Sequence, residues 1–422
     1  MTDSRVEHVT CLGCGCGCDD IAVTIREGRI IETTPPCPVS KAWFGDGSVP
    51  WEVLYDGNRV PVDAALAEAA AILLRARGRL LVHIGGDLST QAQRKAVMLA
   101  DLLGATVDTA TSSTAAGGIL AAQRRGRATA TLGEVRNRGD VLLFWGTDPA
   151  KRYPRFHSRY APDPSGTQVP NGRTDRFVIG VGIGSDKAPA NADVSLALEP
   201  AEEIAALSLM RAAVVGEFPG TPSAPFKAAL DLVPLLTRAR YAVLIHDAEP
   251  SEQPRDPLRV EALIALTQAV NGPTRAALVS LRAGGNRSGA ESVLTWQTGF
   301  PFAVDHSRGY PRYTPEGRGL DRLERGGFSA VLLVGTSVMD SGATVALGGI
   351  DTVVIGPGAS RAGFATRIAI DTGVAGIHET GTGYRMDDVP LPLRPPLPAQ
   401  RSTVETLDAL SGAIHRARKA AS

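Results

Sequence analysis

Short apolar runs that alternate with helical stretches are the feature that most restricts how this sequence can fold. The alternation begins near residue 79 with "RLLVHIGG" and the helical stretch "STQAQRKAVMLADLLG". Buried parallel strands read as short continuous apolar runs, and the helices between them cover both faces of the sheet. The sequence therefore predicts an α/β protein with doubly wound parallel-sheet units. The later apolar runs are "DVLLFWGTDP", "RFVIGVGIG", "VSLALEP", "YAVLIHD", "AALVSLRAGG", "SAVLLVGTS" and "DTVVIGPG".

The length of the chain predicts several folded parts. Its 422 residues exceed one ordinary hydrophobic core, because most domains hold roughly 100–200 residues. Near the N-terminus, "DIAVTIREGRIIET" alternates apolar and polar residues around Glu27 and Gly28, which predicts a β-hairpin. We predict a cysteine-bearing β subdomain at 1–50, α/β units at 51–240 and 241–387, and an extended proline-rich segment with a C-terminal helix at 388–422.

The C-terminal segment has a composition of its own. "DVPLPLRPPLPAQ" is too rich in proline for a helix or a central strand, so we expect it to run extended over a surface. "STVETLDALSGAIHRARKA" then predicts a helix with Leu407, Leu410 and Ile414 on one face. This helix packs either on another subunit or on its own domain, and the sequence leaves both alternatives open.

Composition excludes several classes of partner. Lys and Arg number 44, as do Asp and Glu, so the net charge is zero and no global field attracts nucleic acid. No apolar run reaches the roughly 18 residues of a membrane span, and the first residues have no secretory signal pattern. We therefore expect a cytoplasmic protein that binds neither nucleic acid nor membranes.

Several predicted strands end in glycine-rich turns. A single such turn is most often only a tight turn. Several at equivalent strand ends favour a crevice for a nucleotide-like ligand, because glycine lets backbone N–H groups approach a phosphate. None completes a G-x-G-x-x-G or Walker pattern, so an ordinary NAD or ATP enzyme is not supported. The turns lie at 83–87, 144–149, 180–186, 333–337 and 355–360.

All five cysteines lie in the first 37 residues. Cys11, Cys14 and Cys18 form a C-x2-C-x3-C pattern that Cys37 could complete, and Cys16 stands outside it. In a reducing cytoplasm such a group indicates a metal site and not a disulfide framework. Three close thiolates and a distant fourth are typical of iron–sulfur ligation, and the glycines between them let the loop turn around a cluster. A zinc site or an empty vestigial site are the alternatives.

These residues bear a family resemblance. The cysteine pattern, the hairpin, and Lys41 four residues after Cys37 resemble the molybdopterin oxidoreductases of the formate dehydrogenase type. Residues 131–160, "TLGEVRNRGDVLLFWGTDPAKRYPRFHSRY", and 376–394, "GIHETGTGYRMDDVPLPLR", resemble the B subunit of formylmethanofuran dehydrogenase, most closely its counterpart in the formyltransferase/hydrolase complex of methylotrophs. The resemblance implies a molybdopterin-oxidoreductase-like α/β fold with a small N-terminal β subdomain.

The sequence departs from the redox-active members of that family. In those members a thiolate or selenolate binds tungsten or molybdenum between a strand and a helix. The matching stretch here is "DTATSSTAAGGILAAQ", with Ser113 at the ligand position and no cysteine after Cys37. The stretch also lacks the polar donors that a preorganised active site requires. These departures are typical of an active site that has lost its function. The alternative is that Ser113 binds the metal as an alkoxide.

The resemblance implies a role in one-carbon metabolism, in the oxidation of formaldehyde. Such a complex moves a formyl group from a tetrahydromethanopterin-type carrier to a furan-type carrier and hydrolyses it to formate. The family assigns hydrolysis to the A subunit and formyl transfer to the D subunit, so we expect the A, C and D subunits as partners. Our leading hypothesis is a non-catalytic B subunit with no catalytic cofactor, whose cysteines hold an iron–sulfur cluster or zinc if a metal is retained. The alternative is a tungsten- or molybdenum-pterin oxidoreductase subunit with an iron–sulfur cluster.

The redox alternative also implies cofactor contacts for three polar residues. Lys41 would lie between the cluster and a pterin, whereas without a pterin it is an ordinary surface lysine. Asn286 and Arg287, in "RAGGNRSGAESVLTW", resemble a loop near the cofactor and could bind phosphate or cap the following helix.

Other polar residues are assigned structural roles or left open. His83 and His246, at strand ends, are expected to be core histidines because no second metal ligand is spaced to join them. The family-like stretch also contains a polar group that could contact a nucleotide or a partner subunit, or serve the fold: Trp145, Asp148, His157 and Arg159.

Overall fold

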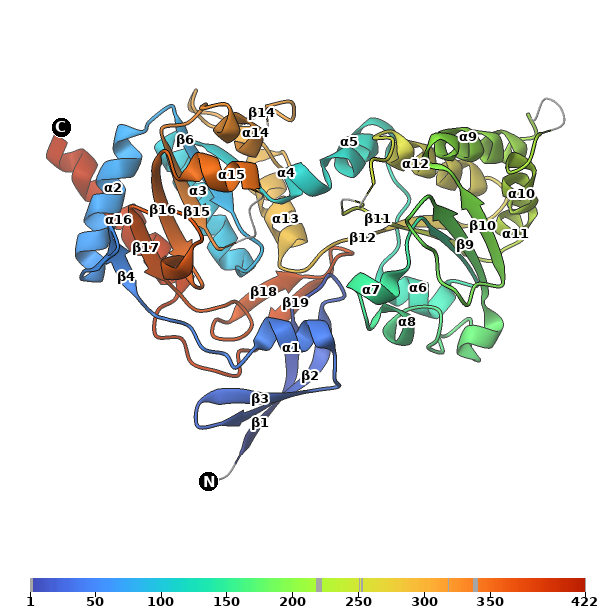
Figure 1. Ribbon diagram of the computed structural model, residues 1–422, viewed down its shortest axis with the longest axis horizontal. Helices are drawn as coiled ribbons and strands as arrows, with labels where there is room; N and C mark the ends of the chain where they lie inside the picture. The colour runs from blue at the N-terminus through green and yellow to red at the C-terminus, as the bar shows by residue number, and fades with distance from the viewer. Residues whose placement is uncertain are drawn as a thin grey trace. The chain divides into compact units, whose positions relative to one another are not determined.

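The computed structural model describes residues 3–217, 222–249, 251, 253–317, 319–336 and 341–421. The chain divides into two compact units (Figure 1). Unit 1 consists of Met1–Ser113 and Gly284–Ser422, and unit 2 of Thr114–Ala283. Unit 2 is therefore an insertion within unit 1, and each unit contains its own sheet.

This division corrects the boundaries expected from the sequence. The expected units at 51–240 and 241–387 place β6 (Leu80–Ile84) and β15 (Ala330–Val334) apart, whereas these strands pair in one sheet. Strand β11 (Ala242–Asp247) joins β8 (Val141–Trp145) instead. An apolar run shows that a strand is buried, but it does not identify the neighbouring strand.

The sheet of unit 1 has nine strands in the order β14-β13-β7-β6-β15-β16-β17-β4-β5. Its centre, from β7 to β17, is parallel, and both edges are antiparallel. The predicted parallel α/β sheet is confirmed. Besides β6 and β15, the strands are β7 (Thr106–Thr109), β16 (Asp351–Gly356), β17 (Ile368–Asp371), β4 (Val53–Tyr55), β5 (Asn58–Arg59), β13 (Val304–Asp305) and β14 (Arg312–Tyr313).

Both faces of this sheet are buried. In β6, Leu80, Val82 and Ile84 belong to the core under one helical layer, and Leu81 belongs to the core on the other face. This alternation follows from the two-residue period of a strand. The first layer contains α2 (Val62–Arg75), α3 (Thr90–Leu103), α13 (Arg287–Thr298) and α16 (Thr403–Ala421), and the second contains α14 (Gly319–Glu324) and α15 (Ser341–Leu347).

The C-terminal helix α16 packs on its own unit, against α2 and α3. Its predicted apolar face is buried, because Leu407, Leu410 and Ile414 belong to the core of unit 1. Lys95 pairs with Asp408 at 2.6 Å, between α3 and α16. Of the two alternatives for this helix, the structure shows packing on its own domain.

A small antiparallel sheet begins the chain, formed by β1 (Ser4–Cys11), β2 (Cys18–Arg26) and β3 (Arg29–Thr34). The predicted hairpin turn is confirmed, since Glu27 and Gly28 both have positive φ and connect β2 to β3. Helix α1 (Pro38–Phe44) follows. The proline-rich segment is extended as expected and contributes β19 (Pro390–Leu393), which pairs with β18 (Gly381–Tyr384).

Unit 2 is built around a five-stranded parallel sheet in the order β10-β9-β8-β11-β12. The strand order reverses between β8 and β11, and in such sheets this reversal is where ligands bind beyond the carboxyl ends of the strands. The strands not yet named are β9 (Phe177–Ile183), β10 (Val194–Leu198) and β12 (Ala276–Leu281). One face is covered by α5 (Ala116–Arg125), α9 (Glu203–Val214), α10 (Phe226–Asp231), α11 (Val233–Thr237) and α12 (Arg259–Val270).

Shorter helices lie on the other side of this sheet (Figure 1), namely α6 (Leu132–Arg138), α7 (Pro149–Arg152) and α8 (Phe156–Arg159). The loop beside them is tied down by Arg176, which is 3% exposed. Its guanidinium donates to the carbonyl oxygens of Gly139, Pro162, Pro164 and Arg136 at 2.6–3.0 Å. Within the described residues, no helix is long and apolar enough to cross a membrane.

Candidate functional site

The cysteine loop of unit 1 brings three of the four predicted ligands together. Cys11 ends β1 and Cys18 begins β2, and the two are partners across the strands. None of the five cysteines forms a disulfide. The pKa of Cys11 is raised to about 12, chiefly by burial and in smaller part by the nearby thiols of Cys14 and Cys18. The three thiols therefore lie within electrostatic range of one another, and binding a metal there would require their deprotonation.

The fourth predicted ligand, Cys37, lies at the start of helix α1, which packs against the cysteine loop at Gly13. Cys37 is buried at the N-cap of α1. The backbone N–H of Gly13 donates to Cys11 Sγ at 3.4 Å and lowers the pKa of that thiol against the effect of burial. Donors directed at sulfur are characteristic of iron–sulfur sites. Lys41, in contrast, is exposed on α1.

The four predicted cysteine ligands could serve either a zinc ion or an iron–sulfur cluster. Among the residues that the structure describes, no three His, Cys, Asp or Glu side chains are arranged to hold one metal ion. Tetrahedral zinc needs thiolates about 2.3 Å from a single point. An iron–sulfur cluster distributes its thiolates over several iron atoms, and both kinds of metal site stay predictions for Cys11, Cys14, Cys18 and Cys37.

A glycine-rich loop supports the cysteine loop through backbone contacts. Gly285 N–H donates to the carbonyl of Leu12 at 2.6 Å, and a Cβ at Gly284 would collide with the carbonyl of Gly13. The adjacent Asn286 is fully buried. Its Nδ2 donates to Leu88 O and Thr90 Oγ1, while its Oδ1 accepts from Tyr384 N at 2.7 Å.

The fold thus uses both ends of the Asn286 amide, and cofactor binding by Asn286 stays a prediction of the redox alternative. Its neighbour Arg287 packs over Gly86, where a Cβ would lie 3.4 Å from Arg287 Cγ. Asn286 therefore joins the start of α13 to α3 and to β18.

Ser113 lies in α4 (Thr111–Thr114), directly after β7. It is exposed, and its hydroxyl donates to the carbonyl of Ala110 at 3.0 Å. The residues that precede Ser113 in the chain include Asp108, which is fully buried at the end of β7. The carboxylate of Asp108 accepts the hydrogen bonds that nearby polar groups donate. Asp108 accepts from Ser112 Oγ at 2.8 Å and from Gly319 N at 2.6 Å. Burial raises the pKa of Asp108, and hydrogen bonds from its neighbours oppose that shift.

Unit 1 contains a strand-end cavity of about 440 Å³. It lies beyond the carboxyl ends of β15 and β16, and two of the predicted glycine-rich turns line it. Thr336 is held there by Asp87, which accepts from both its N and its Oγ1 at 2.9 Å. Residue 337, the last of the predicted turn at 333–337, lies outside the described residues. The lining includes Gly335, Thr336, Pro357, Gly358, Arg361 and Phe364.

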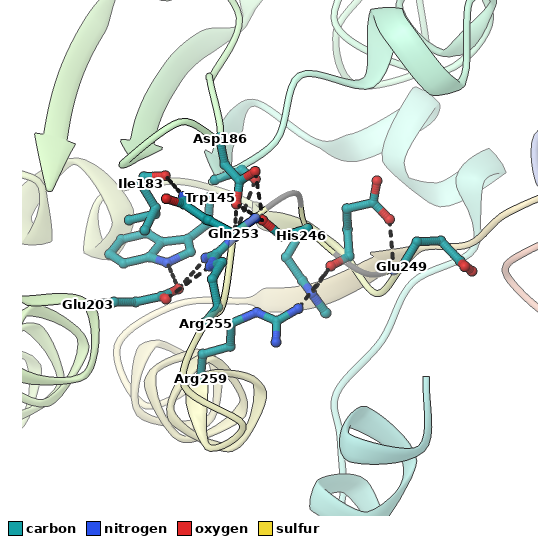
Figure 2. A network of polar contacts seen from close by, with 12 residues as sticks. Trp145, Ile183, Asp186, Glu203, His246, Glu249, Gln253, Arg255 and Arg259 are labelled. Atoms are coloured by element: carbon teal, nitrogen blue, oxygen red, sulfur yellow. Dashed lines mark hydrogen bonds and ion pairs between the residues drawn. The ribbon is translucent and has the colours of Figure 1, made fainter. Parts of the chain in front are cut away.

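Unit 2 has its own strand-end cavity, of about 260 Å³, beside β8, β9 and β11. Figure 2 shows the polar network at this edge, centred on Arg255. Arg255 Nε donates to Glu203 at 3.1 Å, its Nη2 also donates to Glu203, and its Nη1 donates to Asp186 at 3.1 Å. Trp145 Nε1 donates to Glu203 at 2.8 Å.

Sequence reasoning missed this network apart from Trp145. Glu203 begins α9, and Arg255 comes from a connecting segment before α12. A glutamate at the start of a helix is usually a solvated residue that the helix dipole favours. An arginine in a segment between helices and strands belongs to no periodic pattern, so the sequence does not single it out. The strand-end position of Trp145 was the only available signal.

The strand-end histidines are core residues, as expected. Burial lowers the pKa of His83 to about 4 and that of His246 to about 3. His246 Nε2 lies 2.7 Å from Ser280 Oγ. Because both rings are neutral and poorly basic near pH 7, neither suits a general base.

The other polar residues of the family-like stretch serve local structure. Asp148 caps α7 through Ala150 N at 3.0 Å. His157 packs its ring edge against Phe144, with centroids 5.8 Å apart. Arg159 Nε donates to Tyr160 Oη at 3.0 Å.

Sequence comparisons find similar proteins of one type, although no protein-family model matches the chain. The chain is 32% identical to the B subunit of tungsten-containing formylmethanofuran dehydrogenase 2 of Methanocaldococcus jannaschii, over 92% of this chain and 93% of that protein. The corresponding protein of Methanococcus maripaludis is 30% identical with the same coverage. The B subunit of the formyltransferase/hydrolase complex Fhc of Methylorubrum extorquens is 26% identical, over 62% of this chain and 66% of that protein.

The fold also matches a solved structure. The crystal structure of the formyltransferase/hydrolase complex FhcABCD from Methylorubrum extorquens, in complex with methylofuran, contains a chain that aligns with a TM-score of 0.72. The alignment covers 88% of this chain and 100% of that chain, at 23% sequence identity. The predicted fold class is thereby confirmed.

Proposed function

The chain belongs to the family of formylmethanofuran dehydrogenase B subunits, and we propose that it is a non-catalytic, structural B subunit of a formyltransferase/hydrolase complex. Relatives from both branches of the family are subunits of enzymes named for formyl carriers or formyl transfer. In the proposed complex, a formyl group passes from a tetrahydromethanopterin-type carrier to a furan-type carrier. Water then cleaves the formyl–nitrogen bond and releases formate, so no electron acceptor is needed.

The observation that carries this proposal is the state of the position where redox-active relatives hold a metal. Ser113 is exposed and hydrogen-bonded to its own turn, and no cysteine follows Cys37 in the sequence. The carboxylate at the end of β7, that of Asp108, is buried and occupied by four donors. Stabilising charge on a reacting one-carbon group requires donors directed at that group, and these donors are directed at Asp108.

The resemblance assigns hydrolysis to the A subunit and formyl transfer to the D subunit, and the A, C and D subunits are the proposed partners. Without chemistry of its own, the chain would contribute surfaces and a rigid framework to them. We also propose a cytoplasmic location. Cys11, Cys14, Cys18 and Cys37 are the residues that would hold an iron–sulfur cluster, which would then act as a structural link between β1, β2 and α1.

A second candidate function is a tungsten- or molybdenum-pterin oxidoreductase subunit. The retained cysteine group and the similarity to tungsten-containing relatives favour it. In that case Ser113 would be the metal ligand, and the cysteines would hold a cluster for electron transfer.

Elemental analysis and one substitution separate the two candidates. The anaerobically purified complex and the isolated chain are analysed for iron, zinc, molybdenum and tungsten per copy. We expect neither molybdenum nor tungsten, and we expect Ser113→Ala to leave formate production unchanged. Stoichiometric molybdenum or tungsten, with loss of activity in Ser113→Ala, would establish the second candidate.

Ser112→Ala is the matched control for Ser113→Ala. Ser112 is buried and donates to Asp108 at 2.8 Å, so its loss perturbs local packing. An activity loss shared by both variants reports destabilisation, whereas a loss confined to Ser113→Ala reports chemistry at Ser113.

A further inference from the structure

Two glycine turns in unit 2 are covered by side chains of the same chain. A Cβ at Gly146, directly after β8, would lie 2.6 Å from Arg255 Nη1. A Cβ at Gly184, directly after β9, would lie 2.5 Å from Gln253 Oε1. In open parallel sheets, such turns present bare backbone to the phosphates of a nucleotide. Here the backbone is already in contact with a guanidinium and an amide.

Polar side chains of the segment before α12 attach it to the turns after β8 and β9, and Figure 2 labels two of them, Gln253 and Arg255. Ser251 Oγ donates to Asp186 at 2.7 Å, and Gln253 Nε2 donates to the carbonyl of Ile183 at 2.5 Å. Arg255 donates to both Glu203 and Asp186. We call Ser251, Gln253 and Arg255 the arginine plug.

The donors of Arg255 are already used by carboxylates of the same chain. The side chain of Arg255 is 6% exposed, that of Glu203 0% and that of Asp186 17%. Both carboxylates accept hydrogen bonds from Arg255, and the cavity beside them is lined by other cations as well as other carboxylates. Arg255 is also engaged on its Nε, Nη1 and Nη2 atoms, so its donors are directed away from a ligand.

We propose that the arginine plug closes the strand-end crevice of unit 2 to nucleotide-bearing ligands and takes their place in stabilising the turns after β8 and β9. The inference rests on the proposed function for its biological meaning. A subunit that binds no pterin cofactor does not need a site for the nucleotide part of such a cofactor. It concerns unit 2 alone, and its tests measure nucleotide binding and stability without using the activity of the complex. Failure of the plug and failure of the proposed function are therefore distinguishable.

The first test is nucleotide binding by the full chain, with ADP and GDP as probes in equilibrium dialysis. We expect no saturable binding that depends on unit 2 in the unaltered protein. The decisive variant is Thr147→Tyr, which fills the remaining cavity beside Gly146. Saturable binding that Thr147→Tyr abolishes would overturn the proposal. Binding that persists in Thr147→Tyr belongs to another site and leaves the unit 2 crevice closed, as proposed.

The second test measures the structural role of the plug. Arg255→Met removes the cation and leaves the Glu203 carboxylate buried, which is strongly destabilising. We expect a lower melting temperature and faster hydrogen exchange in peptides that cover the turns at 145–148 and 183–186. The double variant Glu203→Gln/Arg255→Met removes both charges, keeps an acceptor for Trp145 Nε1, and should recover most of the loss.

Arg152→Met is the matched control, because Arg152 lines the same cavity but its side chain is 43% exposed. Its loss should change stability little. Equal exchange rates in Arg255→Met and Arg152→Met would overturn the proposal. If Arg255→Met does not fold, the double variant decides between the outcomes. A double variant that folds supports the proposal that the buried Arg255–Glu203 pair stabilises the turns. A double variant that also fails to fold contradicts that proposal.

Discussion

Glu379 gives the C-terminal helix a pH-dependent stability that can be measured. It is 6% exposed, and its Oε1 accepts from the N of Thr403 at 2.7 Å and from its Oγ1 at 2.8 Å. Thr403 is the first residue of α16. The pKa of Glu379 is raised from 4.5 to about 7, chiefly by burial and in smaller part by the carboxylates of Glu405 and Asp87, while the hydrogen bonds from Thr403 oppose the shift.

The direction of the effect follows from proton linkage. A raised pKa means that the folded state holds the proton more tightly than the unfolded state, so this contribution to stability is present below pH 4.5 and is lost as the pH rises to about 7. At 1.36 kcal/mol per pKa unit, the total change is about 3 kcal/mol. Glu379→Gln cannot ionise and keeps an acceptor for Thr403. We therefore expect the variant to match the original protein near pH 4.5 and to be more stable by up to about 3 kcal/mol at pH 8.

Hydrogen exchange of the α16 amides, followed from pH 5 to pH 8, measures this difference locally. Glu405→Gln is the control, because Glu405 lies in the first turn of α16 but is exposed. A stability difference for Glu379→Gln that does not grow with pH would refute the reasoning. So would an equal dependence in Glu405→Gln.

Three further substitutions test the packing. Arg176→Met leaves four carbonyl oxygens without their donor, so chemical denaturation should show unit 2 destabilised by at least about 3 kcal/mol, and no loss would contradict its role as a tie. Leu410→Ala removes a fully buried side chain of α16 and should cost about 2–5 kcal/mol in unit 1. The control on the same helix is Asp408→Ala, which removes an exposed carboxylate and its surface ion pair with Lys95 and should cost about 1 kcal/mol or less; equal losses would contradict the burial argument. Gly284→Ala forces a collision with the carbonyl of Gly13 and should displace the cysteine loop. The N-terminal thiols should then react faster with a maleimide, and unchanged reactivity would show that the glycine-rich loop at Gly284 moves instead of the cysteine loop.

Local elements of the fold were predictable from sequence because they depend on neighbours along the chain. The apolar run at 80–84 became β6, which is buried along its whole length. Glu27 and Gly28 formed the turn between β2 and β3, since a two-residue hairpin favours positive φ at both positions. The apolar stripe of Leu407, Leu410 and Ile414 was likewise visible from the helical period.

Part of the candidate site was also predictable. The spacing of Cys11, Cys14 and Cys18 anticipated thiols that interact, because short loops keep their residues close. The role of Asn286 was not predictable, since its amide partners lie on segments remote in sequence, at Leu88, Thr90 and Tyr384.

The sequence by itself determined the α/β class, the cysteine loop and the glycine turns at the strand ends, because periodicity and spacing are local properties. Only the tertiary structure decided that residues 114–283 form an inserted unit, since strand partners in a parallel sheet come from distant parts of the chain. It also decided that Arg255 covers the turn at Gly146. A buried ion pair depends on which side chains the fold brings together away from water, and no local pattern encodes that meeting.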